Sequence, residues 1–489
     1  MAKGAAWMVG MRLAVRGIGL VSTIVLARLL RPEDFGLVAL ASALVGAIEM
    51  FSQFSLDLAL IREGAAERSH YDTVWTLSLM RGVLIAALLA ALAVPAGHFF
   101  RDVRVTPIVY CFALGSLLEG FQNVGIVDFR KHMTFGREFL FTVSLKIIGF
   151  VVTIAFALIW REYWALIAGI MAGKVAGLGL SYALHPYRPK LCLTHWHSLF
   201  HFSKWLLLNN IVQFLINRLD AFLIGRMLGA RAFGLYDISL EIATLPTAEL
   251  VAPVQRALFP GYAKVASDLN EIRAHYITTF SLVLALALPA AIGIALLPEL
   301  IVDVFLGPKW HDAEPLLQVL AFVGLLHIGA ANSGSVLLAL GKVRMLSHIT
   351  MARLLVLGPL LALGISHFGL AGATYALVAT AAFSVMLYVG ITLRILALAP
   401  TAILHATWRT IVAAVIMAAG VHVLLASWPH GLTGAALILE LASAVAAGAL
   451  IYTATHLVLW RLTGSPAGAE RNVLTAVEVV LRRWRGATA

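Results

Sequence analysis

Long apolar runs, each interrupted by charged residues, Pro or Gly, recur along almost the whole chain. A helix needs about 20 apolar residues to cross about 30 Å of hydrocarbon, because each residue adds about 1.5 Å. Runs of this length predict about fourteen transmembrane helices. The expected spans are 7–30, 36–61, 73–97, 105–127, 137–159, 163–186, 204–227, 233–255, 274–305, 312–340, 345–367, 369–393, 410–427 and 435–460. The pattern therefore predicts an all-α, polytopic membrane protein.

The composition agrees with this pattern. Hydrophobic residues make up 61% of the 489 residues and charged residues 12%, and the mean hydropathy is +0.91. A soluble domain carries about 25% charged residues, so a water-soluble fold is excluded. The first run contains Arg12 and Arg16 and has no cleavage pattern, so we expect a membrane helix rather than a signal peptide. Cys111 and Cys192 are far apart and indicate neither a disulfide framework nor a metal site.

The net charge of +11 is unevenly distributed along the chain. If the N-terminus is cytoplasmic, most of the 36 Lys and Arg residues fall in cytoplasmic segments or adjoining helix ends, Arg353 among them. Cytoplasmic loops of membrane proteins carry such an excess of positive charge. We therefore expect both termini in the cytoplasm, and no nucleic-acid partner.

A short sequence recurs at the turn after the first helix of each half. Residues 25–37 read VLARLLRPEDFGL and residues 223–235 read LIGRMLGARAFGL. The matching positions are Arg28 with Arg226, Leu30 with Leu228, and Phe35-Gly36-Leu37 with Phe233-Gly234-Leu235. Both copies start on the same side of the membrane, which predicts two parallel six-helix halves, with chance similarity as the alternative.

The repeat predicts a division of the chain into five parts. These are an N-terminal six-helix lobe at 1–186, a cytoplasmic connector at 187–203, a C-terminal six-helix lobe at 204–398, two appended helices at 399–463 and a cytoplasmic tail at 464–489. In the connector, His195, His197 and His201 form no H-E-x-x-H pattern and have no nearby set of acids, which favours a membrane-interface segment over a metal site. The tail predicts an amphipathic helix on anionic headgroups, or a helix that docks a partner.

Three segments resemble a known family. They read RLLRPEDFGLVALASALVGAIEMFSQFSLDLALIRE, RLDAFLIGRMLGARAFGLYDIS and FLGPKWHDAEPLLQVLA. They are similar to the polysaccharide transporter branch of the MOP exporter superfamily, the Wzx-like oligosaccharide flippases, from the first helix to about the twelfth. The resemblance implies two lobes around a cavity that opens alternately inward and outward. It also implies transport of an undecaprenyl-diphosphate-linked oligosaccharide for exopolysaccharide, capsule or lipopolysaccharide O-antigen, without enzymatic chemistry.

Polar side chains at membrane depth are candidates for the transport path. A charge at the centre of a membrane helix costs about 2.5–3.5 kcal/mol, so it should face a cavity or a partner. In the seventh span, Asn209, Gln213, Asn217 and Asp220 share one side of the helix, with the cation Arg218 beside them. This stripe predicts a cavity lining, and helix packing is the alternative. Asp220 is a candidate proton or cation site.

Five further cations are candidates for binding the diphosphate. Arg12 and Arg16 lie one turn apart on the first helix, and their guanidinium groups suit a diphosphate. Anchoring to headgroups is the alternative for both. Arg81, Lys146 and Lys174 lie deeper, as does Arg218, and four cations that converge on one cavity would attract an anionic headgroup.

Acidic residues in the second helix of each half are candidates for ion coupling or gating. They are Glu49 and Asp57 in the first half, and Asp237 and Glu241 in the second. The alternative for all these charges is that they pair with one another inside the membrane, and Glu119 is a further available partner.

The sequence also indicates that ATP is not the direct energy source, and it favours a flippase over two other functions. No P-loop motif occurs, so a membrane potential or ion gradient is the remaining energy source, and no cofactor or metal is expected. A multidrug or cation antiporter of the same superfamily is the first alternative, but an arginine-lined cavity suits drug cations poorly. A membrane sugar polymerase is the second, but the external loops are very short. Expected partners are membrane lipids and a polysaccharide polymerase or export machinery.

Overall fold

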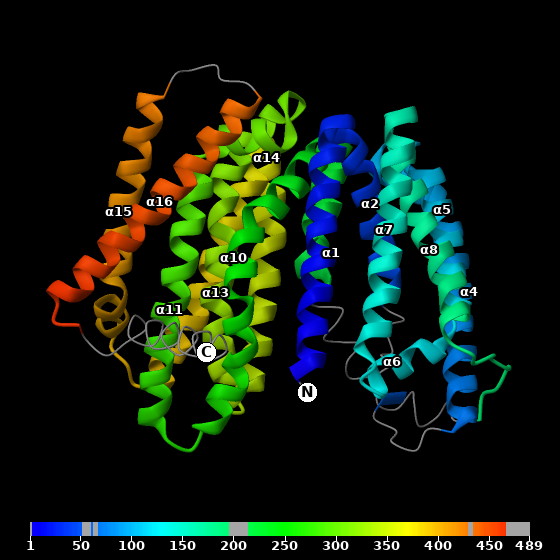
Figure 1. Cartoon of the computed structure of the whole chain (residues 1–489), viewed down its shortest axis with the longest axis horizontal. Helices are drawn as coiled ribbons and strands as arrows, with labels where there is room; N and C mark the ends of the chain where they lie inside the picture. The colour runs from blue at the N-terminus through cyan, green and yellow to red at the C-terminus, as the bar shows by residue number, and fades with distance from the viewer. Residues whose placement is uncertain (1, 51–59, 62–66, 195–213, 429–433, 466–489) are drawn as a thin grey trace, which may run out of the picture. The chain divides into compact units, whose positions relative to one another are not determined.

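The computed structural model describes residues 2–50, 60–61, 67–194, 214–428 and 434–465. These residues form helices and connecting turns, with no strand among them (Figure 1). Nine of the described helices are long and apolar enough to cross a membrane, or ten if one bent pair counts as a span. The prediction of an all-α, polytopic membrane protein is therefore confirmed. The exact count of fourteen stays a prediction.

The elements follow one another along the chain with short connections. They are α1 (Ala2–Leu29), α2 (Pro32–Met50), α4 (Arg68–Phe100), α5 (Val105–Gly120), η1 (Val124–Val127), α6 (Asp128–Lys131), α7 (Phe135–Trp160), α8 (Trp164–Leu184), a helix at 214–228, α10 (Ala230–Lys264), α11 (Leu269–Leu296), α12 (Pro298–Ile301), η2 (Val302–Leu306), η3 (Pro308–Ala313), α13 (Glu314–Ala339), α14 (Val343–Ile395), α15 (Pro400–Ser427) and α16 (Ala435–Leu462).

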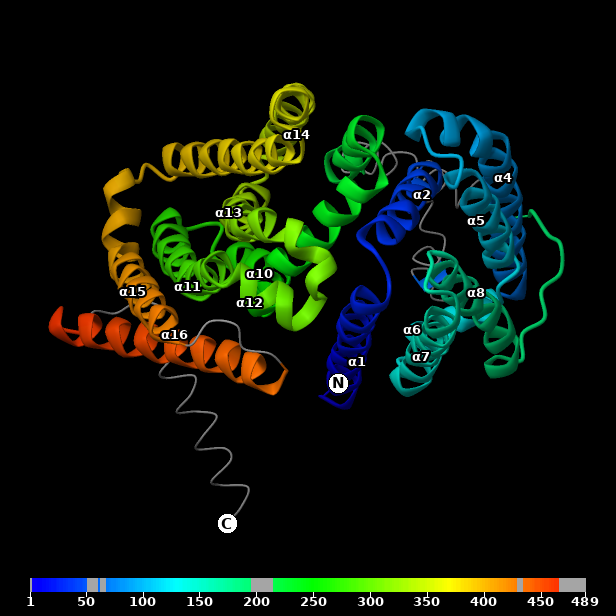
Figure 2. The same ribbon diagram turned by 90° about the horizontal axis from the view of Figure 1, so that it is seen from above.

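The chain divides into two compact units. The N-terminal unit contains Met1–Asp237 and Phe305–Lys309, and the C-terminal unit contains Ile238–Val304 and Trp310–Ala489. In the N-terminal unit, α4 packs along α5, α7 along α8 and α1 along α7, while α2 contacts α4, α5 and α8 (Figure 2). In the C-terminal unit, α13 packs against α11 and α14, and α15 against α11 and α16. The expected boundaries of the two six-helix lobes stay predictions.

One expected span is shorter than predicted. The span 105–127 ends at Gly120, and the helical segment 124–131 turns away from α5 by 73°. Asn123 lies at this turn, where its side chain accepts a hydrogen bond from Gly125 N at 2.9 Å and donates one to the Tyr187 carbonyl oxygen at 2.8 Å. A side chain that satisfies backbone groups in this way competes with helix continuation. The continuous span is therefore corrected to one that ends at Gly120.

Two other expected spans, 345–367 and 369–393, lie within α14. The helix is broken at Gly369, whose φ of 58° and ψ of −136° are not helical. A positive φ is open to glycine without a steric penalty. A single non-helical residue thus separates the two parts of α14, so the connection between these two expected spans is very short.

Candidate functional site

The two Phe-Gly-Leu turns of the sequence repeat touch each other inside the N-terminal unit. Gly36 in α2 and Gly234 in α10 are in backbone contact. A Cβ atom on Gly36 would lie 1.8 Å from the Ala230 carbonyl oxygen, and one on Gly234 would lie 1.9 Å from the Pro32 carbonyl oxygen. Any larger residue at either position would force the two helices apart. The matched sequences therefore form a pair of facing turns.

The Gly-Pro-Lys-Trp turn supports the same end of the N-terminal unit. The Nζ atom of Lys309 lies 3.0 Å from the Leu29 carbonyl oxygen and 3.3 Å from that of Arg28. The last carbonyl groups of a helix have no partner within it and carry a partial negative charge. The ammonium group of Lys309 therefore stabilises the end of α1. The family-like motif acts here as a helix cap rather than as a ligand site.

The charged residues of the RPED sequence complete this turn. Asp34 Oδ2 accepts a hydrogen bond from Arg31 N at 2.9 Å. Glu33 pairs with Arg104, and Arg104 also pairs with Asp102 at 2.8 Å. Burial alone would raise the pKa of Asp102, but the hydrogen bonds from Arg104 hold this pKa below its usual value. These charges compensate one another and serve the fold.

Four charged residues from four helices meet inside the N-terminal unit. They are Glu49 of α2, Arg81 of α4, Glu119 of α5 and Lys174 of α8, and we call them the charge cluster. Lys174 Nζ lies 2.7 Å from Glu119 Oε1, and the charges of Glu119, Lys174 and Arg81 all act on Glu49. Three candidate residues are thus brought together, and Lys174 has the acidic partner that the alternative interpretation expected.

The packing of α1 on α7 fixes which of their residues share a depth. Gly4 contacts the Phe135 ring, and the rings of Trp7 and Phe139 meet edge to face with centroids 5.1 Å apart. These contacts advance along both helices in the same direction. The two helices therefore run side by side and parallel, with residues of α7 about 130 positions later in the chain level with those of α1.

This register places three candidate cations at similar depths on two neighbouring helices. Arg16 lies midway along α1, Arg12 one turn before it, and Lys146 midway along α7, about level with Arg16. Arg16 and Lys146 are exposed and Arg12 is half-buried. Within the described part of the chain, Lys146 forms no hydrogen bond or ion pair. We call this group the α1/α7 cations.

A second set of candidate residues surrounds the junction of the helix 214–228 and α10. Asp220 Oδ2 accepts a hydrogen bond from the hydroxyl of Tyr236 at 3.1 Å, and Tyr236 is fully buried. The charge of Arg218 acts on both Asp220 and Asp237. Asn217 is exposed. An acid pair with one adjacent cation is thus held beside the facing glycine turns.

The structure does not test the remaining predictions for single residues. Glu241 is exposed on α10 in the C-terminal unit. Several predicted residues and segments lie outside the described residues: Asn209, Gln213, Asp57, His195, His197, His201 and the amphipathic tail. Their roles stay predictions.

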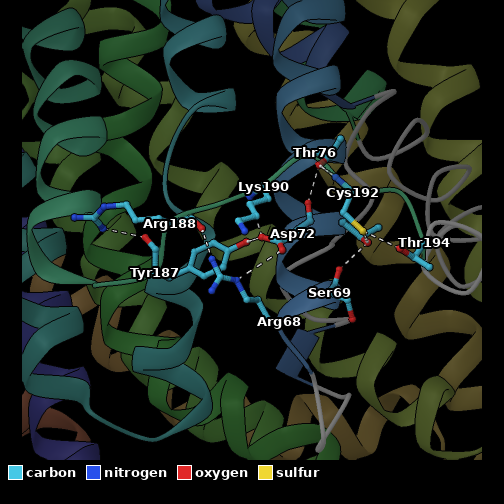
Figure 3. A network of polar contacts seen from close by, with 10 residues as sticks. Arg68, Ser69, Asp72, Thr76, Tyr187, Arg188, Lys190, Cys192 and Thr194 are labelled. Atoms are coloured by element: carbon cyan, nitrogen blue, oxygen red, sulfur yellow. Dashed lines mark hydrogen bonds and ion pairs between the residues drawn. The ribbon is translucent and has the colours of Figure 1, made fainter.

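A polar network that sequence reasoning missed holds the segment after α8 against α4 (Figure 3). Asp72, only 7% exposed, accepts hydrogen bonds from the Tyr187 hydroxyl and from Lys190 N at 3.0 Å. Further along, Cys192 N donates to Thr76 Oγ1 at 2.9 Å. Burial, together with the hydrogen bond to Asp72, raises the pKa of Tyr187, so its phenol stays protonated. The start of the connector is therefore fixed to the N-terminal unit.

A polar contact in the C-terminal unit was also missed. Sequence reasoning placed Arg353 at a cytoplasmic helix end, but an Arg353 Nη2 atom lies 3.0 Å from Nε2 of His327, midway along α13. One signal was available. His327 and Arg353 lie at similar distances along the chain from the turn at Gly341, so two antiparallel helices would place them at the same depth.

Comparisons with known proteins agree with this architecture. Residues 25–315, more than half of the chain, match a family described as "Polysaccharide biosynthesis protein". The Lipopolysaccharide biosynthesis protein WzxC of Escherichia coli (strain K12) is 23% identical over 384 residues, covering 76% of each chain. The Succinoglycan biosynthesis transport protein ExoT of Rhizobium meliloti (strain 1021) is 25% identical over 324 residues, covering 65% of each.

A solved structure shares the fold. The lipid II flippase MurJ, in an inward closed conformation, matches with a TM-score of 0.72 and 10% identity, over 94% of this chain and 99% of that one. These matches confirm the resemblance to the polysaccharide transporter branch of the MOP superfamily. The chain belongs to the polysaccharide biosynthesis protein family of multi-pass membrane proteins.

Proposed function

We propose that this protein is a flippase that moves an undecaprenyl-diphosphate-linked oligosaccharide across the bacterial inner membrane by alternating access. The saccharide would serve exopolysaccharide, capsule or lipopolysaccharide O-antigen synthesis. Family membership supports this proposal, as do relatives whose names state lipopolysaccharide biosynthesis and succinoglycan transport. The protein would move its substrate without changing a covalent bond in it.

The α1/α7 cations are the observation that carries this proposal. Arg16 and Lys146 are exposed at about the same depth on two packed helices, with Arg12 one turn away. A cation inside the membrane is costly unless it faces water or an anion. A diphosphate offers several acceptor oxygens, and guanidinium groups bind such oxygens in pairs. The three side chains therefore match the charged headgroup of a polyprenyl diphosphate.

Acids elsewhere in the N-terminal unit support a driving step. Glu49 in the charge cluster and the pair Asp220 and Asp237 lie in two groups that each also contain a cation. We assign these acids, with Asp57 and Glu241, to ion coupling or gating. Moving one charge through 100 mV provides about 2.3 kcal/mol. A carboxylate that exchanges a cation partner for a proton would link that energy to a change of conformation.

We also infer that both termini are cytoplasmic, in line with the distribution of Lys and Arg. The facing glycine turns of Gly36 and Gly234 would then lie at the external side. The saccharide would leave there toward a polysaccharide polymerase or export machinery. Separation of these turns would open the path outward.

Translocation in proteoliposomes tests the proposal. The full chain is reconstituted with undecaprenyl diphosphate that carries a fluorophore-labelled oligosaccharide, and a membrane-impermeant quencher reports the fraction in the outer leaflet over time. We expect protein-dependent exchange between leaflets, which Arg16→Gln and Lys146→Gln each slow at least about tenfold, because a charged hydrogen bond to phosphate is lost. Arg161→Gln, at the end of α7, removes the same charge outside the span and leaves the rate unchanged.

Two further measurements sharpen the outcome. Gly36→Ala should stop translocation because its Cβ meets backbone atoms, whereas Gly179→Ala, which has open space around it, should not. Wild-type protein that moves none of several labelled saccharide lipids under an imposed pH gradient and potential would refute the flippase proposal. Transport of a cationic dye by the same vesicles would then support an antiporter.

A further inference from the structure

The contact between Arg353 and His327 has an unusual feature: it joins a permanent cation to a neutral group. A guanidinium has only hydrogens to donate, so at 3.0 Å the Nε2 atom of His327 must accept from Arg353. The proton of the imidazole is then on Nδ1, and the ring carries no charge. His327 thus orients the guanidinium without neutralising it.

No described residue supplies the missing negative charge. The Nε atom of Arg353 is buried and has no hydrogen-bond partner in the described part of the chain. The titratable group of opposite type whose charge reaches Arg353 is Tyr388, on the second part of α14. A phenol is neutral at physiological pH because its ordinary pKa is about 10. Among the described residues, Arg353 therefore has an N–H group without an acceptor and a positive charge without a counter-ion.

The depth of the pair makes this excess charge informative. His327 lies midway along α13, a helix that belongs to the most buried of the candidate membrane spans. His327 is nevertheless exposed, and Arg353 is half-buried. A cation at this depth faces water or a counter-ion rather than lipid chains. The two side chains therefore border a path that water or a polar solute can reach.

We propose that Arg353, positioned by His327, binds an oxyanion of the transported saccharide lipid. A sugar carboxylate is the expected group, because His327 accepts from one N–H group of the guanidinium and the remaining ones can bind the two oxygens of a carboxylate in bidentate geometry. The diphosphate is the other source of such an oxyanion, and the α1/α7 cations already offer it three positive charges. The inference rests on the proposed function for the identity of the ligand. The C-terminal unit would then contribute to recognition of the saccharide.

A transport assay with two substrates tests this site. The full chain in proteoliposomes is given labelled undecaprenyl diphosphate that carries either a neutral trisaccharide or the same trisaccharide with one uronic acid. Arg353→Gln should slow translocation of the acidic lipid at least about tenfold and spare the neutral one, and Arg353→Lys should restore part of the rate. Equal loss for both lipids would assign the oxyanion to the diphosphate. Unchanged rates for both would overturn the proposal.

Two controls separate this site from a loss of structure and from a wrong function. Arg344→Gln removes the same charge from the exposed start of α14 and should change neither rate. Binding is measured separately, as the rise in melting temperature that octyl glucuronide or farnesyl diphosphate gives to purified protein, with octyl glucoside as the neutral comparison. If wild-type vesicles transport neither lipid, the flippase proposal fails. A stabilisation by octyl glucuronide or farnesyl diphosphate that Arg353→Gln abolishes would still establish the oxyanion site, and its retention in that variant would refute it.

Discussion

Lys174 in the N-terminal unit and Arg353 in the C-terminal unit are both cations within apolar helices, yet they are treated differently. Lys174 meets the carboxylate of Glu119 at 2.7 Å, whereas Arg353 meets the imidazole of His327 at 3.0 Å. The first cation has a partner of opposite charge and the second has none among the described residues. The cost of a charge in the membrane is thus offset by a carboxylate of the protein for Lys174, but not by any described acid for Arg353.

This difference separates two uses of a charge inside a membrane. A compensated pair fixes two helices relative to each other, and its loss leaves an isolated charge of the opposite sign. An uncompensated cation contributes little to the fold and costs desolvation until an anion arrives. Stability measurements can therefore distinguish the two, because removal of the charge should change stability in opposite directions.

The largest expected effect is at Lys174. Lys174→Met leaves Glu119 and Glu49 with one cation, Arg81, and should lower the stability of the detergent-solubilised protein by about 2 kcal/mol. That value lies below the range for fully buried pairs because the Glu119 side chain is 38% exposed. The measurement is the melting temperature followed by tryptophan fluorescence. The double variant Lys174→Met with Glu119→Gln should recover most of the loss, and an unchanged melting temperature in the single variant would show that the pair does not hold the fold.

Arg353→Met should have the opposite sign and a smaller size. The substitution removes a poorly compensated charge and keeps most of the side-chain volume, so stability should stay the same or rise by about 1 kcal/mol. The same melting experiment checks this, alongside Arg344→Met as a control at the exposed end of α14. A loss as large as that of Lys174→Met would mean that Arg353 is a structural residue, which would contradict its assignment as a ligand-binding cation.

The difference between the two cations was only partly visible in the sequence. Hydropathy placed most helices, and charge at membrane depth picked out Lys174 and named Glu119 as an available partner. The pairing itself depends on how α5 packs on α8, which no periodic pattern encodes. Arg353 was assigned to a helix end because charge near a loop usually marks one, whereas its long side chain reaches His327 across a helical hairpin. Residues at similar distances on either side of such a turn lie at the same depth in two antiparallel helices, and this spacing predicts the contact.

The repeat and the connector give the same lesson at the level of the backbone. The aligned triplets predicted two equivalent turns, but their direct contact at Gly36 and Gly234 follows from tertiary packing. Asp72 could not be predicted because its partners Tyr187 and Lys190 follow α8 in an extended segment without periodicity. Sequence patterns thus identify helices and candidate charges, while partners between distant segments require the fold.

Asp72 extends the comparison to a buried acid that is satisfied mainly by neutral donors. Asp72→Ala removes the acceptor for Tyr187 and Lys190 N and should cost about 1 kcal/mol, less than the loss of Lys174. The effect should be local, so hydrogen exchange of the segment 185–194 is the measurement. Asp72→Asn retains one acceptor oxygen and should show faster exchange than wild type but slower than Asp72→Ala. Equal exchange in all three proteins would mean that this network does not hold the connector.

The exposed pair of Arg104 with Asp102 should show the smallest effect and completes the series. Both charges lie at a turn outside the spans, where water and salt screen them, so Arg104→Gln should change stability by only about 0.5 kcal/mol, and less at high salt. The pKa of Asp102 is held below its ordinary value of 3.8 by Arg104. The stabilisation that this ion pair gives the folded protein is therefore fully present above about pH 4 and lost as the pH falls through the lowered pKa. Melting curves of wild type and Arg104→Gln should converge at that acidic end, because protonation of Asp102 removes the charge that Arg104 pairs with. Curves that stay equally far apart at every pH would show that Arg104 acts through packing, which would leave the intramembrane pair as the clearer example of a charge that holds this fold.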